Sequence, residues 1–271
     1  MSAGAVEAEE RVLDDGWGWS SGRVVGLLAA SAILVAVFLA RSSRHPSPVI
    51  EIGLLGSRSF AVASLATFLF GAALGGMLLS SVLWVQNIWH WSALQSGLAI
   101  LPGPALVPIW SAVAGRLIPR FGPGPVVAGS TAFAVGVAWW AAAIGLRPNY
   151  VTGMLAGMSL TGVGVGLAMP TLLGAAASSL PPQRFAAGSG VVNMVRQIGL
   201  TVGVAVLVAV TGTPHTAAGQ LTAFQRAWVV LAAIALAAGL TGYLLRRPQA
   251  AVKVPAEHIT TASTIGADTD T

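Results

Sequence analysis

One arginine stands in the middle of a long apolar run, accompanied by two amide residues. Arg196 and Gln197 follow Asn193 by three and four residues, a spacing that places all three side chains on one face of a helix. An ionisable group at such a depth is a candidate for a substrate path or a gate network. The alternatives are that the arginine side chain extends to the membrane surface, or that it pairs with a charged substrate. We therefore take Asn193, Arg196 and Gln197 as substrate-path or gate candidates.

A second group of aromatic and amide residues lies at 84–91, where another apolar run ends. Tryptophans at such a position are typical of the aromatic belt at a membrane surface. The alternative is an aromatic vestibule that holds flat, apolar molecules by stacking, and Trp84 and Gln86 are then the substrate-path candidates. The other tryptophans are expected either to pack or face lipid (Trp110, Trp139, Trp140) or to lie at the membrane surface (Trp17, Trp19, Trp228).

The sequence lacks the groups that catalysis or metal binding would need. There is no cysteine, and the four histidines fall in loops or in the C-terminal tail without ligand spacing. No Asp or Glu lies in any apolar run. The only lysine, Lys253, is in the tail and cannot form a buried Schiff base. We therefore expect no enzyme, no catalytic residue, no metal site and no cofactor.

The composition identifies the class of protein that must position these residues. Of 271 residues, 55% are hydrophobic and 8% are charged, about a third of the charged share of a soluble domain. The mean hydropathy is +0.78. The basic residues lie singly or in pairs between apolar runs, which argues against nucleic acid as a partner. The sequence predicts a multi-pass protein of the cell membrane whose main surroundings are the lipid bilayer.

A membrane-spanning helix needs about 20 apolar residues. Seven runs qualify, and together they contain a single charged residue, Arg196. The predicted fold is thus an all-α membrane protein with seven transmembrane helices: Val24–Ala40, Phe60–Val85, Gly97–Gly115, Val126–Leu146, Val151–Leu173, Gly188–Val210 and Ala227–Leu245.

The basic residues predict the orientation of these helices. Nine of them fall on the face that carries the C-terminus and four on the other. Because basic loops stay inside, the C-terminus is predicted to be cytoplasmic and the N-terminus outside. An N-terminus outside without a signal peptide is expected if further helices precede this chain.

Small residues predict where the helices approach one another. Glycines recur at four-residue spacing, which permits close contact between helix backbones. Prolines in the third and fifth runs predict kinks. The helix-packing candidates are Gly153, Gly157, Gly162, Gly166, Gly199 and Gly203, with a further pair at Gly71 and Gly75.

Three stretches resemble a known family. The segment Gly115-Arg-Leu-Ile-Pro-Arg-Phe-Gly122 resembles the G-x-L-x-D-R-x-G loop of the major facilitator superfamily, with Pro119 in place of the family's aspartate. Residues 91–102 resemble the entry to the corresponding helix in that superfamily's fourteen-span drug/proton antiporter group. Residues 179–199 are similar to the penultimate helix of that group. The resemblance makes four residues candidates for a conformational loop: Gly115, Arg116, Arg120 and Gly122.

The resemblance implies the C-terminal part of such a transporter. Residues 1–23 would be a polar N-terminal segment, 24–59 the last inserted linker helix with a cytoplasmic loop, and 248–271 a disordered cytoplasmic tail. Residues 60–247 would form the C-terminal six-helix half-bundle, built from two inverted three-helix repeats. The N-terminal bundle, where this group's proton-coupling carboxylates lie, would be missing.

The implied function is a component of a secondary active transporter. The complete protein would export drugs or small hydrophobic molecules with proton coupling, and this chain alone would not transport. Its partner would be an N-terminal half-transporter or a second copy of itself. The alternative is a stand-alone seven-helix membrane protein with a binding or scaffold role.

Overall fold

The computed structural model describes residues 58–180, 185–214 and 216–245, together with Gly26, Ala29, Ala30 and Ile33. The predicted first transmembrane helix, Val24–Ala40, lies almost entirely outside the described residues, as do the polar N-terminal segment and the C-terminal tail.

Within the described ranges every regular element is a helix. Six of them, counting two continuous pairs as one each, are long and apolar enough to cross a membrane, as the sequence predicts. Their bounds are α3 (Arg58–Asn87), α4 (Ala93–Ile100) with α5 (Pro102–Phe121), α6 (Gly124–Ala143), the π-helix η2 (Tyr150–Leu155) with α7 (Ala156–Ser178), α8 (Phe185–Thr211) and α9 (Ala217–Tyr243).

The second of these spans is interrupted once, just before the first of its prolines. The expected continuous run Gly97–Gly115 is divided into α4 and α5 at Leu101. Pro102 has no N–H to donate to the carbonyl four residues earlier, so the helix loses a hydrogen bond there. The regular helix is thus interrupted at Leu101, whereas α5 continues through Pro108 and α7 through Pro170.

The last span begins earlier than the hydropathy indicates. We expected it at Ala227, but α9 begins at Ala217 and includes Arg226. The Thr216 hydroxyl accepts a hydrogen bond from the Gly219 N–H at 3.1 Å and caps the helix. Because of this cap, α9 includes the polar residues before Ala227, which a hydropathy window leaves out of the predicted span.

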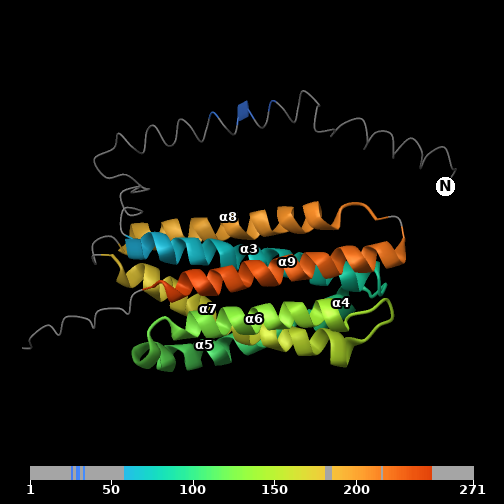
Figure 1. Cartoon of the computed structure of the whole chain (residues 1–271), viewed down its shortest axis with the longest axis horizontal. Coiled ribbons are helices and arrows are strands. Elements are labelled where there is room, and N and C mark those ends of the chain that lie inside the picture. The colour runs from blue at the N-terminus through green and yellow to red at the C-terminus, as the bar shows by residue number, and fades with distance from the viewer. Residues whose placement is uncertain are drawn as a thin grey trace, which may run out of the picture. The chain divides into compact units, whose positions relative to one another are not determined.

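The six spans form two rows. In one row α8 packs on α3, α3 on α7, and α7 on α5. In the other row α9 and α6 pack on each other, and each also contacts the first row, α9 through α3 and α6 through α7. Figure 1 shows α8 and α5 at opposite edges of the bundle.

These contacts repeat themselves within the chain. If α3–α5–α6 is matched with α7–α8–α9, the α3–α8 contact becomes the α7–α5 contact, and α3–α9 becomes α7–α6. Each repeat has three spans, so the second begins on the opposite side of the membrane from the first. The bundle therefore consists of two inverted three-helix repeats, as predicted.

Glycines allow the closest helix contacts. A Cβ on Gly203 of α8 would collide with the Ala72 carbonyl oxygen of α3, and a Cβ on Gly199 would collide with that of Phe68. From α3, a Cβ on Gly71 would lie 2.9 Å from the Arg196 carbonyl oxygen. The α3–α8 contact is therefore a backbone-to-backbone contact that glycine alone permits.

The second repeat contains the equivalent contact. A Cβ on Gly162 of α7 would meet the backbone of Gly103 in α5, and one on Gly166 would lie 2.9 Å from the Val107 carbonyl oxygen. Gly157 lies instead against Trp140 of α6, and Gly153 against Asn149, the residue that precedes η2.

Candidate functional site

The polar group on α8 lies deep within its helix. Arg196 is separated from the start of α8 at Phe185 by about 16 Å of helix, and from its end at Thr211 by about 22 Å. Because the hydrocarbon core of a bilayer is about 30 Å thick, both separations place the Arg196 backbone inside that core.

Arg196 and Asn193 are joined by hydrogen bonds. The guanidinium donates to Oδ1 of Asn193 from Nη2 at 2.9 Å and from Nε at 3.3 Å. Asn193 and Gln197 are exposed, and Arg196 is half-buried. Only 17% of the apolar window of α8 is buried within the bundle, against 61% for α3. The polar group therefore faces outward from the six helices.

No carboxylate of the bundle can neutralise this arginine. All nine acidic residues of the chain precede residue 58 or follow residue 245, outside the helices that the structure describes. The positive charge of Arg196 is thus uncompensated by the bundle.

Trp84 and Gln86, the other substrate-path candidates, are not brought together. Gln86 is exposed at the end of α3, whereas Trp84 is completely buried. The Trp84 ring packs edge-on against Phe224 and Trp228 of α9, with ring centroids 5.2 and 5.4 Å away. Its indole N–H is buried without a hydrogen-bond partner in the described structure. The structure thus places Trp84 in the packed interior of the bundle.

Trp228 does not lie at the membrane surface, so that expectation was wrong. It is fully buried, and its indole N–H donates to the Ser80 hydroxyl at 3.0 Å. The early start of α9 is the reason, because it puts Trp228 in the middle of a helix that packs along α3.

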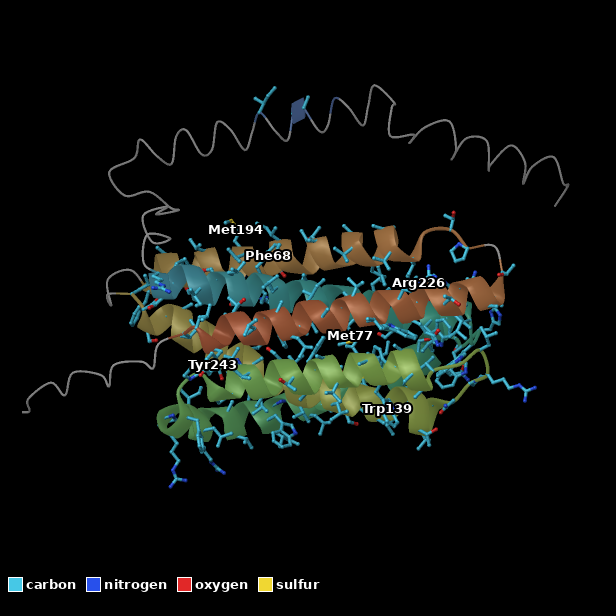
Figure 2. The ribbon with its side chains drawn as sticks, viewed as in Figure 1. Phe68, Met77, Trp139, Met194, Arg226 and Tyr243 are labelled. Atoms are coloured by element: carbon cyan, nitrogen blue, oxygen red, sulfur yellow. The ribbon has the colours of Figure 1, made fainter. Side chains whose placement is uncertain are left out.

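Indole groups also secure the segment between α6 and α7. The N–H groups of Trp89, Trp139 and Trp140 donate to the carbonyl oxygens of Gly145, Thr152 and Met154 at 3.1, 3.0 and 3.0 Å. Trp139 is partly exposed and lies on α6 (Figure 2). At this end of the bundle these three tryptophans hold the segment between α6 and α7 in place.

Two residues that the sequence analysis missed contribute to the same end. Asn149 Oδ1 accepts from the Gly153 N–H at 2.8 Å and caps η2. An asparagine directly before an apolar run is a capping signal that could have identified it. The Tyr150 hydroxyl donates to the Ala99 carbonyl of α4 at 3.0 Å, close to the proline break. Nothing in the sequence pairs Tyr150 with Ala99, since the two residues belong to different repeats.

The basic segment Gly115–Gly122 is helical over most of its length, contrary to the expectation of a loop. Gly115, Arg116 and Arg120 lie in the last turns of α5, and only Gly122 and Pro123 connect α5 to α6. Gly122 ends the helix with a φ of 58°, and its N–H donates to the Ile118 carbonyl at 2.8 Å. A positive φ favours glycine, which lets a very short connection reverse the chain.

The comparisons with known proteins agree with this architecture. The family model described as Major Facilitator Superfamily matches residues 12–204. The chain is 31% identical over 193 residues to a multidrug resistance protein Stp of Mycobacterium tuberculosis, covering 70% of this chain and 35% of that protein. It is 30% identical over 176 residues to a multidrug resistance protein B homolog of the same species, covering 64% and 33%. The tetracenomycin C resistance and export protein of Streptomyces glaucescens is 28% identical over 195 residues, covering 70% and 35%. The chain thus spans about a third of the length of these curated relatives.

Proposed function

The chain belongs to the major facilitator superfamily, and from this membership we propose that it is the C-terminal part of a proton-coupled exporter of small hydrophobic molecules. The relatives named for multidrug resistance and for tetracenomycin C export support the kind of cargo. Their greater length supports a transporter in which this bundle is one of two.

The observation that carries the proposal is the internally repeated six-helix bundle with two little-buried edges. The spans Ala93–Phe121 and Phe185–Thr211 are each 17% buried, the lowest values of the six. They are equivalent helices of the two repeats, and they end the row α8–α3–α7–α5. A row with two such edges offers a broad face to a second bundle, as alternating access by two rocking bundles requires.

The polar residues of α8 give this second bundle an energetic role. A solitary bundle would expose Asn193, Arg196 and Gln197 to lipid, where unsatisfied polar groups cost free energy. Coupling to protons also needs a group that titrates within the path. The helices from residue 58 to 245 contain no Asp or Glu, so that group would belong to the partner.

We expect no active transport from this chain by itself. The test is to reconstitute the purified chain in liposomes, impose a pH gradient and follow the efflux of a cationic dye. Dye efflux should equal that of empty liposomes, and it should appear when the chain is co-reconstituted with a matching N-terminal half. Gradient-driven efflux from the chain alone would contradict the proposal.

The proposed orientation places the end of α5 inside the cell and the end of α8 outside. It can be tested by labelling introduced cysteines. The chain has no cysteine, so single introduced thiols give an unambiguous label. Thr213→Cys should react with a membrane-impermeant maleimide on intact cells, because Thr213 is exposed just after α8. Phe121→Cys, at a residue 57% exposed at the end of α5, should react only after the cells are opened. The opposite pattern at both positions would reverse the orientation.

A further inference from the structure

We propose that α8 binds a carboxylate-bearing helix of the partner bundle, with Arg196 as the residue that pairs with the carboxylate. The inference rests on the proposed function in one respect only, namely that a second bundle is the partner. It adds the chemistry of the contact: an ion pair inside the membrane, formed on the exposed face of α8.

The first argument is charge. Arg196 lies at hydrocarbon depth, where an unpaired guanidinium is costly. Asn193 accepts only from Nε and Nη2, so the Nη1 donors still need an acceptor. All acidic residues of the chain lie outside 58–245. A carboxylate is the side chain that satisfies both the charge and the forked geometry of a guanidinium.

The second argument is the pattern along the helix. Ser189, Asn193, Gln197 and Thr201 follow one another at intervals of four residues and are all exposed. This spacing places them in one stripe along α8, with Arg196 beside it. Met194, also exposed, points away from the bundle on the same helix (Figure 2). An exposed polar stripe on a transmembrane helix is suited to a polar partner and not to lipid tails.

The third argument compares the two repeats. Gly71 and Gly75 of α3 meet the backbone of Arg196 and Leu200, as Gly162 and Gly166 of α7 meet that of Gly103 and Val107. Arg196 is therefore equivalent to Gly103. In the same register Asn193, Gln197 and Thr201 are equivalent to Ile100, Pro104 and Pro108.

Three of the four stripe positions are thus apolar in the first repeat, Ile100 in α4 and two prolines in α5, although the glycine contact behind them is the same; only Ser189 has a polar equivalent, Ser96. Packing of the repeat therefore does not require polar residues at these positions. Their presence on α8 alone points to a role in binding. The position of Arg196 is also well fixed, because its carbonyl oxygen lies against Gly71 of α3.

The test uses the full chain and a synthetic transmembrane helix as the probe. The peptide consists of leucine and alanine with terminal lysines and a single glutamate at its middle, and the matched peptide has glutamine there. A donor dye on Thr213→Cys and an acceptor on the peptide report binding by energy transfer. The measurement is made in phosphatidylcholine liposomes at mildly alkaline pH.

We expect the chain to bind the glutamate peptide about tenfold more tightly than the glutamine peptide. Arg196→Met should abolish this preference, and Arg196→Lys should keep part of it because the charge remains. Arg226→Met is the matched control, since Arg226 is an exposed arginine of another helix, α9. It should leave the preference unchanged.

Three outcomes would overturn the inference. The first is equal binding of the two peptides to the unmodified chain. The second is a preference that survives in Arg196→Met, which would place the carboxylate elsewhere. The third is loss of the preference when phosphatidylglycerol is added, which would assign Arg196 to a lipid phosphate. Because no transport is measured, each of these results would leave the proposal of a half-transporter standing, and a failed efflux experiment would not affect the peptide result.

Discussion

Arg196→Ala should abolish export by the assembled transporter while its expression stays near normal. In the proposed ion pair, removing the arginine leaves the partner's carboxylate buried and unpaired, at a cost of about 3 to 5 kcal/mol. A loss of that size in the state that binds or moves substrate lowers the rate of export by about a hundredfold or more. The measurement is dye efflux from liposomes that contain this chain together with its N-terminal half.

Two variants make this result specific. Arg196→Lys should recover little export, because an ammonium group lacks the planar fork that reaches Asn193 and a carboxylate together. Arg226→Ala removes an exposed arginine of α9 and should export normally. Normal export by Arg196→Ala would instead favour an arginine whose side chain extends to the membrane surface.

Gly203→Ala should strongly destabilise the bundle. The added Cβ would collide with the Ala72 carbonyl oxygen, a backbone atom that cannot move without shifting α3. Overpacking of this kind costs about 1 to 3 kcal/mol. The protein in mixed micelles is titrated with sodium dodecyl sulfate, and the loss should appear as a lower free energy of unfolding.

Gly190→Ala is the matched control on the same helix. A Cβ at Gly190 has no neighbour within 4 Å. Alanine is also favoured over glycine within a helix by about 0.5 to 1 kcal/mol, so this variant should unfold at the same or a higher detergent concentration. Equal stability of the two variants would show that the α3–α8 contact tolerates a side chain.

Some features of the fold could be predicted from the sequence, and others could not. The positions of the six described spans could be predicted because a bilayer imposes both a minimum length and an apolar composition on each helix. The break in the second span could be predicted because Pro102 lacks an N–H wherever the helix is placed. The start of α9 was missed, since a capped helix end depends on Thr216 and not on hydropathy.

The candidate site shows the same division. The sequence alone groups Asn193, Arg196 and Gln197, because residues three and four apart share a helix face by geometry. It could not separate Trp84 from Gln86. These residues are close in the chain, yet one packs against Phe224 and Trp228 of α9 and the other is exposed.

The sequence by itself therefore determined which segments cross the membrane and which of them contains a charge. Only the tertiary structure decided that α3 meets α8 through Gly71, Gly199 and Gly203, and that Trp228 is buried against Ser80. The physical reason is that lipid and the protein interior are both apolar. Apolar side chains therefore face both, and the sequence does not show which face of a helix is buried. The rotation of each helix is fixed only when its small residues find a backbone to pack against.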